Sequence, residues 1–484
     1  MLKSLLKNIR PWGLGVVCAA ASVGLGSCIE DGISTSPSDQ PEFSVDTLAI
    51  GDVFTDETTP TYSFKVYNRH DKVMSINSIR LTGSKDYFRL NVDGQSGRVF
   101  SNVEIRPKDS IFVFVDVNLP ANGSFDPLEV TDAVEFVTNG VSKKVTVTAV
   151  GQDIERLHGL VITGHERWSG DRPRQIFDSL VVAPGASLTI EAGAKLYFHD
   201  KSRLKVHGTL VTLGTAEKPV EMTGDRRGTV ITVVSFDLMS RQWEGVDFTT
   251  TSRDNSLSFT EIRNTWTGVR VDSVPMGTRP ALEMTNCRLR NADGHAFSSL
   301  HSWIRATGCE FAEAGAGSVS IIGGRLDMDH CTLSNYYLFS VIRGACLQLG
   351  HLKTPDNSDP SPWPDMPYLK AEITNTVIYG SSADMSPTSL DDTDAYLRRC
   401  LLRSAGKDDD HFIDIIWDED PLFHTVRADY LFDYRPKPDS PVTGASIPTS
   451  LQLPATDFYG APHPAAPALG AYEPCSEQHD KQNQ

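Results

Sequence analysis

Three cysteines recur at a fixed interval in the second half of the chain. Cys287, Cys309 and Cys331 are each 22 residues apart, in the near copies TNCRL, TGCEF and DHCTL. Evenly spaced thiols suit a metal site, a disulfide ladder or one wall of a repeating core. Structural zinc needs paired ligands at close spacing, such as C-x-x-C, and the sequence holds no such pair. Parallel side chains orient poorly for a disulfide, so we expect a core column and keep the disulfide and the metal as alternatives.

A charged column runs at the same interval, four residues before each cysteine. Its members alternate in sign, and a parallel row two residues earlier carries one aromatic residue and two cations. The candidate ligand patch comprises Trp303, Arg305, Arg325, Asp327, Lys370 and Glu372, with Glu283 beside it. Asp327 and Glu372 are like charges on neighbouring units, an arrangement that is unfavourable unless cations or a metal neutralise them.

This patch has three interpretations. A solvated face would form ion pairs between units, each worth a few tenths of a kcal/mol. A glycan or partner site would use tryptophan to stack on a sugar ring, and carboxylates and arginines to hydrogen-bond its hydroxyls. A calcium-dependent polysaccharide lyase would need a carboxylate cluster for Ca²⁺ and an Arg or Lys as base. No lyase or hydrolase motif maps onto the patch, so the catalytic residues are left unknown and Ca²⁺ is the one cofactor considered.

Apolar residues at the 22-residue interval predict a stacked β-coil. The apolar columns are Leu282, Ile304, Leu326; Met284, Ala306, Met328; the three cysteines; and Leu289, Phe311, Leu333. The period-2 alternation shifts by one at Asn286, Gly308 and His330, which indicates a corner between two short strands. Thr376 and Cys400 continue the cysteine column. Stacked coils bury one continuous core, so the sequence predicts a β-solenoid.

The same region resembles the right-handed parallel β-helix of the pectin-lyase-like group. The resemblance rests on GTLVTLGTAEKPVEMTG at 208–224, W-x-GV at 243–246, and DPLF, DSPVTGAS, DFYGAP and ALGAYEP between 420 and 474. It implies a right-handed β-helix over 153–474. Within it, five prolines among the fourteen residues TPDNSDPSPWPDMP predict a loop at 353–367 that leaves the coil and carries Trp363, because proline cannot donate to a stacked ladder. This fold hosts lyases, hydrolases, epimerases and adhesins, so it does not fix an activity.

The preceding part of the chain predicts a β-sandwich over 42–152. TYSFKVYN at 61–68, SIFVFVDVNL at 110–119 and KVTVTAV at 144–150 are short β-rich runs separated by turn residues. IRPKDSIFVFVDV at 105–117 followed by VEFVTNG at 134–140 resembles immunoglobulin-like domains of the ASPM/SPD-2/hydin type. The expected fold class is therefore all-β: an Ig-like β-sandwich followed by a right-handed parallel β-helix.

The N-terminus has the order of a secretory signal. A basic start and an apolar run lead to LGSC, which ends at Cys28, so residues 1–27 are expected to be a signal peptide. LGSC resembles the lipobox of bacterial lipoproteins, which implies acylation of Cys28. Glu30 and Asp31 resemble the export tag of surface lipoproteins in Bacteroidetes. We expect residues 28–41 to form a solvated tether and residues 475–484 a flexible tail.

The overall charge narrows the function classes. With 62 acidic and 45 basic residues the formal net charge is -17, which argues against a general nucleic-acid binder.

We expect an outer-membrane lipoprotein at the cell surface, with a periplasm-facing or secreted protein as alternatives. Its β-helix would present a long, flat surface that binds glycan or another surface partner without chemistry. The alternatives are a polysaccharide lyase or glycoside hydrolase, and a structural surface-layer component.

Overall fold

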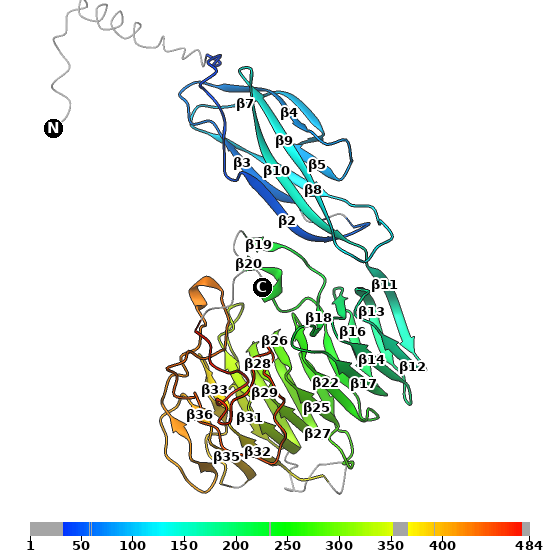
Figure 1. Cartoon of the computed structure of the whole chain (residues 1–484), viewed down its shortest axis with the longest axis vertical. Coiled ribbons are helices and arrows are strands. Elements are labelled where there is room, and N and C mark those ends of the chain that lie inside the picture. The colour runs from blue at the N-terminus through cyan, green and yellow to red at the C-terminus, as the bar shows by residue number, and fades with distance from the viewer. Residues whose placement is uncertain are drawn as a thin grey trace, which may run out of the picture. The chain divides into compact units, whose positions relative to one another are not determined.

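The protein is almost entirely β-structure and divides into two compact units (Figure 1). It is described here by a computed structural model that covers residues 32–57, 59, 61–231, 234–351, 366–391 and 393–476. The first unit contains the chain up to Pro120 and Leu128–Gly151, and the second contains Ala121–Pro127 and everything from Gln152 onwards. The fold class is as predicted: an Ig-like β-sandwich followed by a parallel β-helix.

The first unit is a sandwich of two five-stranded sheets with the orders β1-β3-β8-β5-β6 and β2-β10-β9-β4-β7. Its strand pairs are antiparallel, as the β9–β10 and β3–β8 ladders illustrate. Alternate residues of each strand point inward, so that Val113, Val115 and Val117 of β8 are fully buried against Phe64 and Phe136. The strands are β1 Glu42–Phe43, β2 Thr47–Phe54, β3 Tyr62–Tyr67, β4 Met74–Leu81, β5 Phe88–Val92, β6 Gln95–Gly97, β7 Val99–Ile105, β8 Ser110–Val117, β9 Leu128–Thr138 and β10 Val141–Gln152.

Part of the segment expected to be a tether is fastened to this sandwich. The Ser34 backbone N–H donates to the Val73 carbonyl at 2.8 Å. The Gln40 side chain donates to the Thr138 carbonyl at 3.0 Å. A polar Ser- and Asp-rich composition is typical of a solvated linker, but here the Ser34 backbone and the Gln40 side chain pair with backbone groups of the sandwich. Residues 1–31, with the predicted signal peptide and Cys28, lie outside the described residues.

The second unit is a solenoid in which 26 strands of the described residues form one continuous sheet, and the ladders between its coils are parallel. Apart from it, β19 (Thr229–Ile231) and β20 (Val234–Ser235) form a small hairpin, and η1 (Phe236–Leu238) and η2 (Arg427–Asp429) are 3-10 turns. The solenoid strands are β11 Glu155–Ile162, β12 His165–Trp168, β13 Arg174–Val182, β14 Ser187–Glu191, β15 Lys195–Phe198, β16 Arg203–Val206, β17 Thr209–Leu213, β18 Val220–Gly224, β21 Gly245–Phe248, β22 Asn255–Ser258, β23 Thr260–Arg263, β24 Val269–Asp272, β25 Leu282–Thr285, β26 Arg288–Ala292, β27 His295–Thr307, β28 Glu310–Ala314, β29 Gly317–Asp329, β30 Thr332–Asn335, β31 Leu347–Gly350, β32 Lys370–Thr374, β33 Val377–Gly380, β34 Met385–Ser386, β35 Asp394–Arg398, β36 Leu401–Leu402, β37 Phe412–Ile413 and β38 Ile416–Trp417.

Each coil contributes to three faces. We call the face formed by β22, β25, the second halves of β27 and β29, β32 and β35 the groove face. The face formed by β23, β26, β28, β30, β33 and β36 is the covered face. The long strands β27 and β29 bend in the middle, at His301 (φ 39°) and at Gly323 and Gly324, so that their first halves belong to a third face.

The predicted corner lies between the groove face and the covered face. The residue before each member of the cysteine column is in the left-handed region: Asn286 (φ 46°), Gly308 (φ 64°), His330 (φ 47°), Asn375 (φ 49°) and Arg399 (φ 51°). This conformation turns the chain and causes the one-residue shift in alternation that the sequence displays. One turn of the coil therefore corresponds to the 22-residue interval, because Leu282 pairs with Ile304 on the next coil and Ile304 with Leu326 on the one after.

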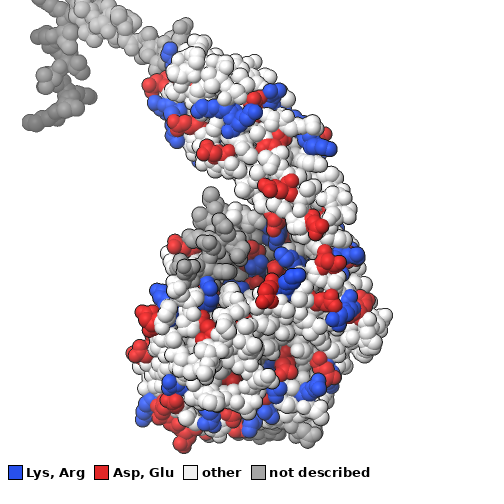
Figure 2. Space-filling model, in the orientation of Figure 1, with Lys and Arg blue, Asp and Glu red and all other residues white. Residues whose placement is uncertain are grey.

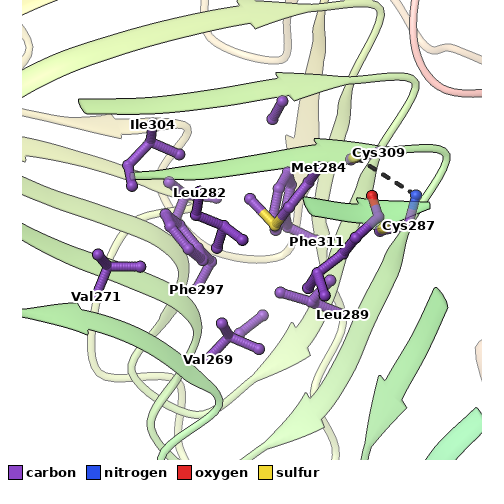
Figure 3. Packing of buried hydrophobic residues seen from close by; sticks show 14 of the residues in the cluster. Val269, Val271, Leu282, Met284, Cys287, Leu289, Phe297, Ile304, Cys309 and Phe311 are labelled. Carbon is purple, nitrogen blue, oxygen red and sulfur yellow. Dashed lines mark hydrogen bonds between the residues drawn. The ribbon is translucent and has the colours of Figure 1, made fainter. Parts of the chain in front are cut away.

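The cysteines are core residues, as predicted. Figure 3 shows Cys287 and Cys309 beside Leu289, Met284 and Phe311 in the interior of the solenoid. Their thiols are free and fully buried, and the Cys287 backbone N–H points at the Cys309 sulfur at 3.5 Å. Burial raises the pKa of both thiols well above the ordinary value, because a thiolate would lose its water. The column is therefore part of the core of the solenoid, and its thiols are not joined to one another in this structure.

The solenoid strands end at Trp417, and the remaining chain turns back along the coils. We call residues 418–476 the strap, the dark red trace that crosses the coils in Figure 1. Its aromatic residues Phe432, Tyr434, Phe458 and Tyr472 pack on Ala312 of β28. The strap had been expected to continue the β-helix to residue 474. The motifs between 420 and 474 that resemble the end of a β-helix instead form a cover on the outside of the coils.

Candidate functional site

The residues of the predicted patch lie side by side on the groove face. Trp303 is opposite Arg325, and Arg325 is opposite Lys370. In the next row Arg305 is opposite Asp327, and Asp327 is opposite Glu372 (β27, β29 and β32). Parallel coils stacked in register place each of these neighbours about 4.8 Å apart at the backbone. The predicted loop lies between β31 and β32, and positions 352–365 lie outside the described residues. The register from β29 to β32 is kept on the far side of this segment.

The sequence suggests a flat surface here, but in the structure this face is hollowed into a groove. The groove has a volume of about 810 Å³. Its floor is the outer side of β25, β27, β29, β32 and β35, and strap residues 447–452 form its wall. The wall is attached to the corner residues: the Asn375 side chain donates to the Ile447 carbonyl at 2.9 Å and accepts from the Ile447 N–H at 2.9 Å. Further along, the Thr449 hydroxyl donates to Asp329.

The charges of the floor are paired one to one. Arg305 lies 3.2 Å from Glu283 on the preceding coil, and Arg398 lies 3.5 Å from Glu372. Lys370 lies 3.4 Å from Asp394 at the groove edge. These side chains are between 28% and 52% exposed, so each pair contributes little to stability, and water or a ligand can replace the partner. The unfavourable contact that the sequence suggested between Asp327 and Glu372 is thereby relieved, because each has its own cation.

Asp327 is held more firmly than the other carboxylates. It is only 6% exposed. Arg325 donates to one oxygen at 3.0 Å, and the Trp303 indole N–H donates to the other at 2.8 Å. The Trp303 ring lies beside two guanidinium groups, 4.7 Å from that of Arg325 and 5.7 Å from that of Arg305. Trp303 therefore fixes the acid and stacks against cations, and it does not line the groove.

Five of the six patch residues line the groove, together with several that the sequence analysis missed. The additional floor residues are Thr285, Thr307, Asp329, Thr374 and Arg398. A signal for them existed, because all five occupy the row two residues before the cysteine column and its continuations at Thr376 and Cys400. The wall at 447–452 had no comparable signal, since its sequence IPTSLQ has no period and its partners lie far away in the chain.

Cations and anions alternate elsewhere on the solenoid as well (Figure 2). Ion pairs between neighbouring coils recur at Arg167 with Glu191, Lys195 with Glu221 and Arg270 with Asp247. Alternation by itself is thus a general property of the outer surface, and what sets the groove apart is its depth and its wall. Over the described ranges, no three His, Cys, Asp or Glu side chains are grouped closely enough to hold a metal ion.

Cys28 falls among residues 1–31, and most of the predicted proline-rich loop falls in 352–365, so both lie outside the described residues. In the part of the chain that the structure describes, no helix has the length and apolar character needed to cross a membrane.

Comparison with known proteins yields no family. No family model matches the chain, and no curated protein matches it. Among solved structures, the ASH / PapD-like domain 7 of human CEP192 is 12% identical with a TM-score of 0.18, covering 25% of this chain and 90% of that one. A protein of unknown function from Porphyromonas gingivalis is 10% identical (TM-score 0.18; 26% and 60%). The CupB6 tip adhesin of Pseudomonas aeruginosa is 15% identical (TM-score 0.18; 22% and 40%).

These likenesses are too weak to carry an argument about this chain. The chain spans less than two thirds of the length of the last two structures. The fold assignment rests on the two antiparallel sheets and the long parallel sheet described above.

Proposed function

We propose that the groove binds a glycan or another surface partner without transforming it. The chain would be an exported, lipid-anchored surface protein of the pectin-lyase-like type, held to the outer membrane through Cys28. The observation that carries the binding proposal is the groove itself: about 810 Å³, floored by rows of paired charges and threonines and walled by the strap. Ligand sites are concave and contain a few convergent polar groups that fix orientation.

The pairing of the floor supports binding over catalysis. A general base must reach the proton it removes within hydrogen-bond distance. Both oxygens of Asp327 already accept hydrogen bonds, from Arg325 and from Trp303. The half-exposed pairs behave differently, because sugar hydroxyls can donate to Glu283 or Glu372 and accept from Arg305 or Arg398 with little loss of pairing energy.

One observation favours an enzyme as the second candidate. Asp327 and Glu372 occupy neighbouring coils in register, so their backbones are about 4.8 Å apart. Retaining glycosidases place their two carboxyl groups about 5–5.5 Å apart. For this chemistry Asp327 would have to leave Arg325 or Trp303 when substrate binds.

A polysaccharide array read in two ways separates the candidates. Wild-type protein is tested against neutral and acidic polysaccharides for retention and, in parallel, for unsaturated products by absorbance and for new reducing ends. We expect retention without product, and a loss of retention of at least tenfold in the double variant Arg305→Ala/Arg398→Ala. Arg167→Ala is the matched control, since Arg167 pairs with Glu191 on β12 and β14, outside the groove. Product formation that disappears in Asp327→Asn would replace binding by catalysis.

The anchor is tested independently of the groove. Labelled palmitate should enter the wild-type protein in cells and should not enter Cys28→Ala. Equal labelling of the two proteins, or none in the wild type, would contradict a lipid anchor at Cys28.

A further inference from the structure

The strap buries a charged surface that an ordinary apolar cover would not tolerate. The covered face carries three carboxylates and three guanidinium groups that are largely buried, and strap residues contact Arg288, Glu310 and Glu313 directly. The charged residues of this face are Glu261, Arg263, Arg288, Arg290, Glu310 and Glu313. Burying charges is costly unless each has a partner, so every contact that the strap makes here bears on whether it stays in place.

Two of the three carboxylates are fully compensated by cations. Arg290 Nε donates to Glu310 Oε1 at 2.8 Å, and the Tyr472 hydroxyl of the strap donates to Glu310 Oε2 at 2.5 Å. Burial alone would raise the pKa of Glu261, but Arg288, Arg263 and Arg290 outweigh it and lower that pKa to about 2. Both acids therefore have guanidinium partners near neutral pH.

Glu313 is the exception. It stands at the end of β28 in the left-handed conformation (φ 50°) and is 2% exposed. The Tyr434 hydroxyl of the strap and the Tyr336 backbone N–H, at 3.3 Å, both donate to Oε1, whereas Oε2 has no hydrogen-bond partner. No cation forms an ion pair with it among the described residues. Burial raises its pKa to about 7, against the lowering effect of the Tyr434 hydrogen bond.

The surroundings of Glu313 contain few other groups that could titrate with it. Facing it are Tyr434 from the strap, Tyr336 after β30, Arg290 of β26, Glu310 of β28 and Cys346 before β31. Burial raises the pKa of Cys346 to about 12, and that of Tyr434 well above its usual value. Arginine keeps its charge at every relevant pH. Glu313 has no ion-pair partner among the described residues and a pKa raised to about 7, so its charge changes between pH 5 and 9.

We propose that the strap is a releasable cover on the solenoid, closed by the Glu313–Tyr434 contact while Glu313 is protonated, and that loss of the Glu313 proton to solvent promotes its opening. The same strap supplies the wall of the groove at 447–452. Opening would therefore also widen the groove, a consequence that rests on the proposed function; the release itself does not.

The direction of the pH effect follows from linkage. With the strap open, Glu313 meets water and its pKa returns toward 4.5; with the strap closed, it is about 7. The raised value stabilises the closed state fully below pH 4.5, and this stabilisation is lost as the pH rises through 7. A shift of this size corresponds to an opening equilibrium that rises on the order of 100-fold between pH 5 and pH 8.5.

Hydrogen exchange of the full-length protein, measured without any glycan, tests the release. Protection of strap peptides that contain Tyr434 and Tyr472, corrected for the intrinsic pH dependence of exchange, should fall on the order of 100-fold between pH 5 and 8.5, while β27 and β29 remain protected. Glu313→Gln keeps the shape and removes the charge, so its strap should stay protected across this range. Glu191→Gln, which removes a carboxylate paired with Arg167 outside the groove, is the matched control and should show the strap protection of the wild type.

Two outcomes would overturn the proposal. One is a strap whose protection does not change with pH in the wild type. The other is a pH dependence that persists in Glu313→Gln, which would assign it to a group other than Glu313. If Glu313→Gln does not fold, Tyr434→Phe decides: it should lower strap protection at every pH and keep the pH dependence. Because no glycan is present, failure here leaves the glycan-binding test untouched, and failure of that test leaves this one untouched.

Discussion

The groove face and the covered face are two sides of the same coils, separated by a single corner residue per coil. Both carry alternating arginines and carboxylates. On the groove face the pairs are about one third exposed, as with Arg305 and Glu283. On the covered face Glu310 is fully buried between Arg290 and the strap. One repeating pattern thus yields a largely ligand-accessible surface on the groove face and a buried network on the covered face, where strap residues such as Tyr472 pack on the charges.

The largest effect is expected from breaking a pair on the covered face. Arg290→Ala leaves Glu310 buried without its closest cation, and removal of one partner from a buried pair costs about 3–5 kcal/mol. The midpoint of urea unfolding should fall accordingly, and strap peptides should lose protection first. The double variant Arg290→Met/Glu310→Leu should regain much of that loss, since an apolar pair needs no compensation. A midpoint of urea unfolding that is unchanged in Arg290→Ala would mean that burial does not make the ion pairs of the covered face more important for stability than those of the groove face.

An intermediate effect is expected at Asp327, which lies on the groove face but is buried. Asp327→Asn removes charge while keeping size, and it weakens the hydrogen bonds from Trp303 and Arg325. We expect a loss of about 1–3 kcal/mol in unfolding free energy, because buried donors lose a charged acceptor. The fluorescence of Trp303, obtained by subtracting the spectrum of the Trp303→Phe variant, should shift in Asp327→Asn because the indole N–H loses its charged acceptor. A stability equal to that of an exposed-pair variant would show that the face, rather than burial, sets the cost.

The smallest stability effect is expected for the exposed groove pairs. Arg305→Ala should change the unfolding free energy by less than about 1 kcal/mol, since Glu283 is 42% exposed and water can replace its partner. Under the proposed function the same variant should lose glycan retention. The unfolding free energy is measured by calorimetry or chemical denaturation, and glycan retention is measured on the polysaccharide array with the same protein preparation. A large loss of stability without loss of binding would contradict the comparison on both counts.

Much of the solenoid could be predicted because its information is local and repeated. The 22-residue columns predicted Arg305 and Asp327 as in-register neighbours, the continuation of the cysteine column at Thr376 added Glu372, and the shift in alternation at Asn286 predicted the corner. The same register would also have given Arg398, two residues before Cys400. The cysteines illustrate why context matters: a single TGCEF has several chemical meanings, whereas three aligned copies flanked by apolar columns mark the core.

The strap could not be predicted in the same way. Its contacts join residues more than one hundred positions apart, as between Glu313 and Tyr434 or Glu310 and Tyr472. Its sequence has no period that would reveal a partner, and its resemblance to the end of a β-helix suggested further coils. Consequently the groove wall, the burial of the covered face and the unusual environment of Glu313 were all missed.

The sequence by itself determined the coil, because apolar residues at a fixed interval must face one interior and can do so only when the coils stack in register. It also determined which charges become neighbours, since register follows from that stacking. Only the tertiary structure decided which of those charges remain in water. The decision belongs to a nonrepetitive segment that folds back over one face, and the free energy of a charge depends on its solvent far more than on its position in a repeat.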